Sequence, residues 1–221
     1  MMMSKRKKLN EFNRLNIYCI TAEKFSRGKD NITVVKEMLQ AGVRIIQYRE
    51  KYKSFKEKYD ECVRIRQMTL KNGAIFIIND HPDLCLMVGA DGVHLGQDDY
   101  PVRVVRKLLG EKYIIGVSTH SPKQYKKAIA DGADYAGVGP LFKTNTKDDV
   151  MPPVGLKYLK WVVKNAQIPF VAIGGIKEHN IEKVIKAGAK CVCLVTEITQ
   201  ANDIKEKIRS IFKKMKIEKK E

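Results

Sequence analysis

The fold of this chain is decided by two neighbouring stretches, Ile77-Ile-Asn-Asp-His-Pro-Asp83 and Ala90-Asp-Gly-Val-His-Leu-Gly-Gln-Asp-Asp99. The apolar run 74–78 is rich in β-branched residues and too short for an ordinary helix, so it predicts a strand buried on both faces. The run 92–95 predicts a second strand of the same kind. Polar side chains directly follow each run: Asn79, Asp80, then Gln97, Asp98 and Asp99. The same chemistry therefore stands at the same end of two successive strands.

The two aspartates at these ends predict a site for a divalent cation. If the strands are parallel, their carboxyl ends lie side by side, and Asp80 and Asp99 come within reach of one Mg²⁺, which prefers carboxylate and water oxygens. The alternative is structural: Asp80 begins a turn before Pro82, and Asp99 caps a helix that starts near Pro101. The two interpretations can coexist, so this pair alone leaves both open.

Composition bounds the class of protein. A chain of 221 residues suits a single α/β barrel domain. The formal net charge of +17 suggests nucleic acid, but much of the excess lies in the terminal runs 5–8 and 213–220, which we interpret as solvated. Interleaved aromatic residues and known nucleic-acid motifs are lacking. We therefore expect small anionic, phosphorylated substrates and no nucleic-acid partner.

The cysteines and the N-terminus indicate the compartment. The five cysteines form an odd set without paired or zinc-like spacing, which favours a reduced, cytoplasmic environment. Cys191 and Cys193 lie two apart in an expected strand, where we interpret them as small core residues. The N-terminus lacks an apolar signal region, and no apolar run is long enough for a membrane span, so no membrane contact is predicted.

Hydrophobic periodicity predicts eight strands alternating with eight helices. The expected strands cover 16–21, 43–48, 74–78, 92–95, 113–117, 134–138, 170–173 and 190–195. The expected helices cover 31–41, 55–72, 82–88, 101–109, 122–130, 155–165, 180–187 and 201–215. We divide the chain into a basic segment 1–15, with a short helix over 9–15 that could close one end of the fold, a barrel domain 16–216 and a charged tail 217–221.

A repeat of glycines supports this count. Gly42, Gly89, Gly132 and Gly188 each join a helix to a strand, and they recur about every two βα units. Strands and helices that alternate eight times favour a closed (β/α)₈ TIM barrel. An open doubly wound sheet is the alternative, because periodicity does not show closure.

In such a barrel the active site forms at the carboxyl ends of the strands. The polar residues fall there: Gln47, Arg49 and Lys51, then Asn79 and Asp80, Gln97 and Asp99, Ser118 and His120, the loop 142–147, Gly174-Gly175, and Val195-Thr196. Cations beside two aspartates suit a diphosphate chelated by Mg²⁺, although each cation alone is more typical of a surface ion pair. The glycine pair either admits a second phosphate or forms a tight turn. His120 is the histidine at this rim and a candidate acid or base, whereas His94 is expected to be a hydrogen-bonded core residue.

Taken together, the rim motifs resemble the thiamine phosphate synthase family. The matching stretches, in the order of the family, are Gln47-Tyr-Arg-Glu-Lys51, Ile78-Asn-Asp80, Ala90-Asp-Gly-Val-His-Leu-Gly-Gln-Asp-Asp99, Gly116-Val-Ser-Thr-His-Ser121, Gly132-Ala-Asp-Tyr-Ala-Gly-Val-Gly-Pro140, Thr144-Asn-Thr-Lys147 and Ala172-Ile-Gly-Gly-Ile176. They extend over roughly residues 17–199. An ordered set of this length is highly specific.

The resemblance implies an alkyl transferase that condenses hydroxymethylpyrimidine diphosphate with a (carboxy)thiazole phosphate and releases diphosphate in a Mg²⁺-assisted dissociative displacement. It implies that the pyrimidine diphosphate is bound by Gln47, Tyr48, Arg49, Glu50, Lys51, Asn79, Ser118 and Lys147, among which Ser118, Lys147 and Arg49 are catalytic. It implies that the thiazole phosphate is bound by Thr144, Asn145, Thr146, Gly175, Val195 and Thr196, and the metal by Asp80 and Asp99.

Departures from the family pattern and one rival enzyme accompany this prediction. Tyr48 replaces a frequent Leu, with a side chain expected to face away from the ligand, and Val195-Thr196 replaces Ile-Ser while keeping the hydroxyl. The rival is the related thiazole tautomerase, an isomerase on the same barrel that uses a histidine at the position of His120. That reading leaves Asp80, Asp99 and the rim lysines without a purpose.

Overall fold

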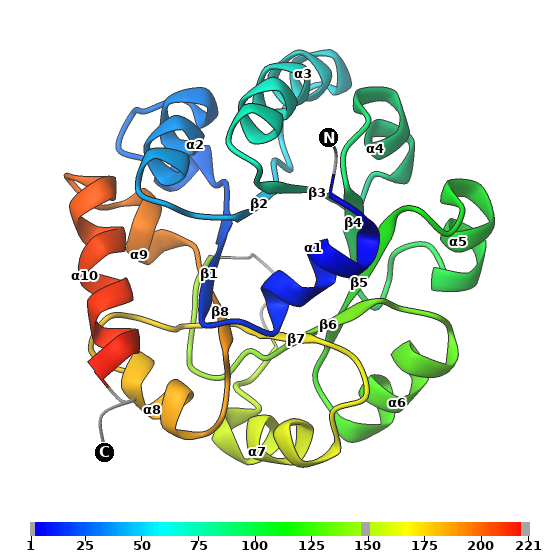
Figure 1. Cartoon of the computed structure of the whole chain (residues 1–221), viewed down its shortest axis with the longest axis vertical. Helices are drawn as coiled ribbons and strands as arrows, with labels where there is room; N and C mark the ends of the chain where they lie inside the picture. The colour runs from blue at the N-terminus through cyan, green and yellow to red at the C-terminus, as the bar shows by residue number, and fades with distance from the viewer. Residues whose placement is uncertain (1–2, 147–150, 218–221) are drawn as a thin grey trace.

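The structure, a computed structural model, describes residues 3–146 and 151–217. Its centre is a closed barrel of parallel strands in sequence order, with β8 hydrogen-bonded back to β1 (Figure 1). The strands are β1 (Asn16–Ile20), β2 (Ile45–Tyr48), β3 (Ile75–Asn79), β4 (Gly92–Leu95), β5 (Ile114–Thr119), β6 (Tyr135–Val138), β7 (Phe170–Ala172) and β8 (Cys191–Leu194). Closure confirms the predicted (β/α)₈ barrel and rules out the open sheet.

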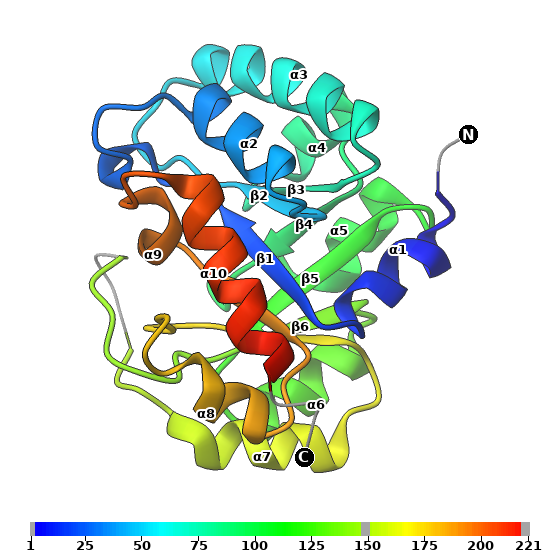
Figure 2. The ribbon, with the colours of Figure 1, turned by 60° about the vertical axis from the view of Figure 1, so that its left-hand side comes forward.

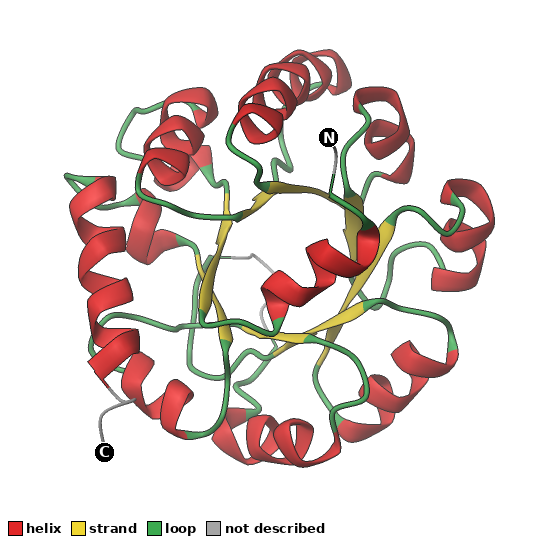
Figure 3. Ribbon diagram, in the orientation of Figure 1, coloured by secondary structure: helices red, strands yellow, loops and turns green. Residues whose placement is uncertain are grey.

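Apart from α1, which lies across the mouth of the barrel, the helices form an outer ring around it (Figure 3). The helices are α1 (Lys5–Phe12), α2 (Asn31–Gln40), α3 (Phe55–Lys71), α4 (Pro82–Val88), α5 (Val102–Leu109), α6 (Pro122–Ala130), α7 (Gly155–Asn165), α8 (Ile181–Lys186), α9 (Thr196–Thr199) and α10 (Ile204–Ile217), with a 3-10 turn η1 (Glu23–Phe25). The four repeated glycines all have φ between +61° and +103°, so they end helices as predicted. The short elements η1 and α9 were not expected from periodicity, which needs longer segments to show.

The register of the barrel places the carboxyl ends of β2, β3 and β4, which carry polar residues, next to one another. Tyr48 pairs with Ile78, and Asn79 pairs with His94, so β2, β3 and β4 end side by side. Side chains alternate along each strand between two apolar layers, one inside the barrel and one between strands and helices. Cys191 and Cys193 lie in the inner layer and are buried, as expected.

Helix α1 closes the amino-terminal mouth of the barrel (Figures 1 and 2). It starts earlier than the expected 9–15, because the side chain of Ser4 accepts a hydrogen bond from the backbone of Lys7 and caps the helix at Lys5. Lys5 pairs with Asp134 at 2.7 Å and Lys8 with Asp91 at 2.6 Å. The expectation that this basic run is merely solvated is therefore wrong for these two lysines.

Phe12, at the end of α1, inserts into the barrel. Its ring is 1% exposed and lies 4.5 Å from the ring of Tyr135 and 6.1 Å from that of Tyr18, measured between centroids. The bottom of the barrel is thus filled by three aromatic rings, which leaves the opposite mouth for ligands. Within the described residues, no helix is long and apolar enough to cross a membrane.

Candidate active site

The two predicted metal ligands come together at the ends of β3 and β4. Asp80 follows β3 with a left-handed backbone (φ 63°) that turns the chain, and its backbone N–H donates to the carbonyl of His94 at 2.9 Å. The Oδ2 atom of Asp99 accepts from the backbone N–H of Gly96 at 2.6 Å. The two carboxyl groups are hydrogen-bonded to each other. The N-cap of α5 is Pro101 and no side chain caps that helix, so the capping alternative is wrong for Asp99. The turn expected at Asp80 before Pro82 is present, and it coexists with the closeness of the two carboxyl groups.

The pKa values of the two carboxyl groups are driven in opposite directions, which is the behaviour of two carboxylates forced together. Burial raises the pKa of Asp99, and so does its hydrogen bond with Asp80. Burial by itself would raise the pKa of Asp80, but the hydrogen bond with Asp99 and the positive charge of Lys51 outweigh burial and hold that pKa below its usual value. The ammonium of Lys51 lies 3.1 Å from Asp80 Oδ2. This ammonium supplies positive charge beside the two carboxyl groups.

The chemistry of this corner fits a hard divalent cation. Asp80 and Asp99 supply carboxylate oxygens at one point, and Mg²⁺ is commonly held by one or two carboxylates with water and substrate phosphates. Within the described part of the chain, no cluster of three or more His, Cys, Asp or Glu side chains could hold a metal ion. Other ligands of such an ion would be water, substrate oxygens or neutral oxygens of the protein.

A chain of hydrogen bonds runs inside the barrel toward the rim. Gln47 Nε2 donates to the hydroxyl of Tyr18 at 2.7 Å, and that hydroxyl lies 2.9 Å from the hydroxyl of Tyr135. The Tyr135 hydroxyl lies 2.8 Å from His94 Nδ1, and His94 Nε2 lies 3.0 Å from Ser118 Oγ. Burial raises the pKa of both tyrosines, so both keep their protons. The chain joins two predicted substrate-binding residues, Gln47 and Ser118, through three others.

Tyr18, Tyr135 and His94 were not predicted as site residues. The sequence signal for the two tyrosines is a lone hydroxyl in an otherwise apolar strand, which does not by itself tell inside from outside. His94 is hydrogen-bonded through both ring nitrogens, which confirms its expected satisfied role. All three line a cavity of about 30 Å³ within the barrel. Such a space holds about one water, so a ring-sized ligand must displace side chains at the mouth.

Arg49 lines the same cavity and has an unpartnered donor. Its Nε is buried and has no hydrogen-bond partner among the described residues. Its backbone N–H donates to Thr21 Oγ1 at 2.9 Å, which fixes the loop after β2. A buried guanidinium N–H without an acceptor is costly. An anion arriving at this mouth would satisfy that donor.

Two predicted ligand residues face away from the cavity. The hydroxyl of Tyr48 donates to Glu61 at 2.7 Å in the layer between β2 and α3, as its expected outward orientation requires. Glu50 accepts from the backbone N–H of Glu23 at 3.0 Å. Burial raises the pKa of Glu50. Both side chains contact neighbouring elements, and neither residue lines the cavity. Lys147 lies outside the described residues.

A second polar corner forms after β6, β7 and β8. The hydroxyls of Thr144 and Thr146 lie 3.1 Å apart, while Asn145 between them is exposed. Lys177 Nζ donates to Thr196 Oγ1 at 3.0 Å, at the start of α9. In this fold a short extra helix after strand eight frequently frames a phosphate site. Lys177 was not predicted, and the signal for it is a lysine just after the glycine pair of β7.

The glycine pair after β7 is required by packing. A Cβ on Gly174 would lie 2.4 Å from Cα of Pro140, and one on Gly175 would lie 2.5 Å from the carbonyl of Lys143. Both glycines also have positive φ. The loop after β6 therefore rests on backbone that only glycine can provide. The tight-turn interpretation therefore holds.

His120 is tied into the loop after β5. Its Nδ1–H donates to the carbonyl of Gly139 at 2.5 Å, and its backbone N–H donates to Gln124 at 2.7 Å. The hydrogen bond through Nδ1 fixes the ring and places the proton on that nitrogen in the neutral form. The ring thus bridges the β5 and β6 loops.

Comparisons with known proteins agree on one family. The family model described as thiamine monophosphate synthase matches residues 17–198. A thiamine-phosphate synthase from Caldicellulosiruptor saccharolyticus is 60% identical over 96% of this chain and 96% of that protein, and one from Pelotomaculum thermopropionicum is 57% identical over 95% and 96%. The solved thiamine phosphate pyrophosphorylase from Pyrococcus furiosus superposes with a TM-score of 0.84 at 32% identity, covering 93% and 98% of the two chains. A 3-hexulose-6-phosphate synthase structure, with a TM-score of 0.67 at 16% identity over 90% and 99%, shares the fold alone.

Proposed function

This chain belongs to the thiamine monophosphate synthase family, and we propose that it joins hydroxymethylpyrimidine diphosphate to a thiazole phosphate with release of diphosphate. Membership makes it a transferase of thiamine biosynthesis and confirms the resemblance seen in the sequence. The tautomerase alternative finds no support in these relatives. The observation that carries the proposed chemistry is the corner where the carboxyl groups of Asp80 and Asp99 lie together beside the ammonium of Lys51.

The departing diphosphate would lie over this corner. Mg²⁺ held by Asp80 and Asp99 would neutralise charge that develops on the leaving oxygens. Lys51 would turn from Asp80 toward the phosphates, and the unpartnered Nε of Arg49 would donate to them. Ser118 and Lys147 would complete this shell. Each of these groups would stabilise the diphosphate more strongly in the transition state, where negative charge develops on it, than in the bound substrate. This difference would lower the activation free energy.

The pyrimidine would enter the small cavity between Gln47, Asn79 and Ser118. The hydrogen-bond chain through Tyr18, Tyr135 and His94 restricts the rotamers of Gln47 and Ser118, so that their polar groups meet a ring in one orientation. Tyr48 and Glu50 would act through the loop that they hold. Their predicted role in binding then rests on backbone groups.

The thiazole phosphate would lie at the second corner. Thr144, Asn145 and Thr146 would face it from the β6 loop, and Gly175, Val195 and Thr196 from the turns after β7 and β8. Lys177 adds a cation beside Thr196. Hydroxyls, backbone N–H groups and one ammonium suit a phosphate dianion.

In the reaction, the bond between the pyrimidine methylene carbon and the diphosphate oxygen breaks first, and its electron pair leaves with diphosphate. The electron-rich aminopyrimidine stabilises the resulting cation, and the lone pair of the thiazole nitrogen forms the new carbon–nitrogen bond. This sequence requires no side-chain nucleophile. The protein contributes position and electrostatic stabilisation.

We also propose a cytoplasmic location and small phosphorylated molecules as the partners of this chain. Five buried cysteines, none in a disulfide, support a reducing compartment. The ion pairs of Lys5 and Lys8 with Asp134 and Asp91 take two cations out of the basic run that had suggested nucleic acid.

The test is an assay with both purified substrates and Mg²⁺, comparing Asp80→Asn with Asp98→Asn. Asp98 is exposed, so its variant removes the same charge one residue from Asp99 without touching the proposed ligands. We expect Asp80→Asn and treatment with EDTA each to lower kcat by about 100-fold or more, while Asp98→Asn stays near wild type. Full activity of Asp80→Asn in excess EDTA would falsify the metal-assisted mechanism.

A further inference from the structure

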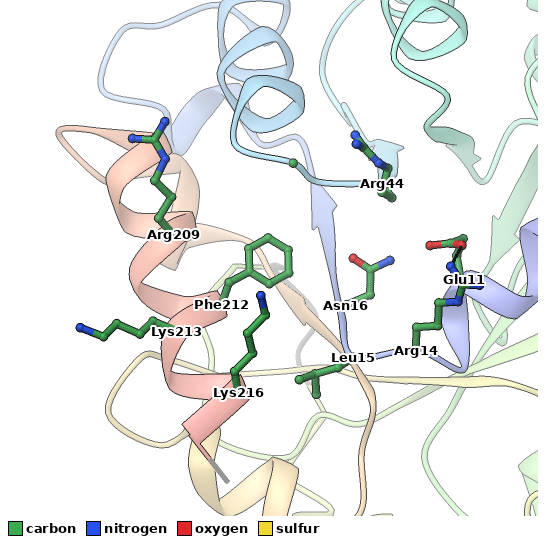
Figure 4. Close-up of a pocket in the computed structure, with 10 residues that line it drawn as sticks. Glu11, Arg14, Leu15, Asn16, Arg44, Arg209, Phe212, Lys213 and Lys216 are labelled. Atoms are coloured by element: carbon green, nitrogen blue, oxygen red, sulfur yellow. Dashed lines mark hydrogen bonds and ion pairs between the residues drawn. The ribbon is translucent and has the colours of Figure 1, made fainter. Parts of the chain in front are cut away.

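A cavity of about 590 Å³ opens at the amino-terminal end of the barrel, opposite the rim that carries the substrate-binding residues. Three separate segments line it: the junction of α1 and β1, the loop before β2, and the last turns of α10 (Figure 4). Its volume falls within the range of small-molecule sites, roughly 300–1,000 Å³. The proposed reaction makes no use of this end of the molecule.

The lining of this cavity is strongly basic. Five of its ten residues are cationic, Arg14, Arg44, Arg209, Lys213 and Lys216, and one is acidic, Glu11. Glu11 is already paired with Arg14 at 3.0 Å, so it neutralises none of the others. Within the described part of the chain, Arg44, Lys213 and Lys216 form no ion pair. Elsewhere on the molecule lysines and arginines repeatedly face carboxylates, as Lys207 faces Glu178 at 2.6 Å.

The cavity also has an apolar floor and a free amide. The ring of Phe212 and the side chain of Leu15 lie between the cations, and the side chain of Lys216 extends beside the Phe212 ring (Figure 4). Asn16 is held through its Oδ1, which accepts from the backbone N–H of Ile17 at 2.9 Å. Its Nδ2 has no acceptor among the described residues and is open to the cavity. A flat ring could stack on Phe212 while Asn16 donates to it.

We propose that this cavity binds a small organic polyphosphate with a flat ring, of the nucleoside triphosphate class. Cations on three separate segments reach more than one phosphate group, which favours a polyphosphate over a single phosphate. The apolar floor favours a ring attached to it. This class of ligand differs from both substrates of the synthase in carrying three linked phosphates, and the site is separate from the catalytic rim.

The experiment is isothermal titration of the full chain with ATP, inorganic triphosphate and adenosine at physiological salt. Two double variants are compared: Arg44→Glu with Lys216→Glu in the cavity, and Lys123→Glu with Lys160→Glu on α6 and α7. Lys123 and Lys160 are exposed and unpaired within the described residues, so both double variants change the net charge equally. We expect wild type to bind ATP more tightly than triphosphate and adenosine hardly at all. The cavity variant should weaken ATP binding by about tenfold or more, since hydrogen bonds to charged groups are lost.

Synthase activity in both double variants serves as the check of folding, because none of the four residues lies at the catalytic rim. Equal weakening in the two double variants would mean that net charge alone attracts the anion, and the proposal would be wrong. Unchanged ATP affinity in the cavity variant would place binding elsewhere, including the catalytic rim, and would also overturn it. So would the absence of ATP binding to wild type.

Discussion

Tyr135 links the floor of the barrel to the catalytic rim through one hydroxyl group. That hydroxyl lies within hydrogen-bond distance of both Tyr18 and His94, and its ring packs on Phe12. Tyr18 is buried and His94 is half-buried, so the only replacement for this hydroxyl among the described residues is a water in the small cavity that the three side chains line. Catalytic orientation and stability therefore depend on the same atom.

Tyr135→Phe should reduce both properties. Removing the hydroxyl leaves Tyr18 and His94 short of a buried partner, and we expect the free energy of unfolding to fall by about 1–3 kcal/mol. Because His94 then holds Ser118 less firmly, kcat should fall about tenfold with a smaller change in KM. Tyr125→Phe is the matched control, since that hydroxyl donates to the carbonyl of Ile168 outside the barrel. Urea unfolding measures the change in stability, and steady-state kinetics measures the changes in kcat and KM. Equal kinetic effects in the two variants would contradict a positioning role.

The residues that sequence reasoning missed share one property. Tyr18, Tyr135 and Lys177 acquire their roles from which way a side chain points or what a neighbouring loop presents. Asp80 and Asp99 could be predicted because carboxylates directly after strands meet at one rim whatever the register. Tyr48 and Glu50 lie in a recognisable motif, yet their side chains turn to Glu61 and to the backbone of Glu23. A motif identifies the segment, and only packing identifies the direction.

Helix α1 acts as the floor of the catalytic chamber, and Phe12 is its contact with the site. Phe12→Ala should cost about 3–5 kcal/mol of unfolding free energy, the usual range for a buried phenylalanine. It should also raise KM for the pyrimidine substrate, because Tyr18 and Tyr135 gain space to move away from Gln47 and His94. Phe12→Leu, which refills most of the volume, should restore both. Chemical denaturation and kinetics measure the pair. A stability loss without any kinetic change would show that the floor is independent of the site.

Helix α10 is tied to the turn after β7 through Glu178. This carboxylate accepts from Lys207 Nζ and Ser210 Oγ, each at 2.6 Å, and the hydrogen bond from Lys207 followed by that from Ser210 lowers its pKa. A carboxylate with a lowered folded pKa stabilises the fold above its unfolded pKa, about 4.3, and loses that contribution as pH falls through the folded value.

Glu178→Gln should therefore lower the free energy of unfolding by about 1 kcal/mol at pH 7. The difference from wild type should shrink as pH falls below about 4, where the wild-type carboxyl is protonated too. Asp60→Asn, on an exposed carboxylate of α3 without an ion pair among the described residues, should change little at any pH. Thermal melts from pH 3 to pH 7 test this. A difference that grows on acidification would have the wrong sign.

At the scale of the whole molecule, most of the fold could be predicted because its period is local. Six helices, α2 to α6 and α8, are followed within two residues by a glycine of positive φ, and each strand is a short apolar run, so most of the repeats are visible in the sequence. Closure could not be seen locally, because it depends on β1 pairing with β8 across the length of the chain. The helix that closes the amino-terminal end of the barrel was predicted only in part, because its contacts also depend on residues distant in sequence. The helix itself could be seen, but the partners of Lys5 and Lys8, Asp134 and Asp91, are distant in sequence.

Because the barrel is closed and its cysteines are buried, we predict that the five thiols react slowly with labelling reagents in the folded protein. Cys19 lies on β1, Cys62 on α3, Cys85 on α4, and Cys191 and Cys193 on β8, and all are buried. Burial raises the pKa of Cys85 to about 12 and raises those of Cys19, Cys62 and Cys191, so their reactive thiolates are scarce near neutral pH. We expect Ellman's reagent to label the folded protein very slowly at pH 8. On addition of denaturant all five should react together, at the midpoint of global unfolding. Rapid labelling of Cys19, Cys191 or Cys193 in the folded protein would mean that the seam between β1 and β8 opens separately from the rest of the barrel.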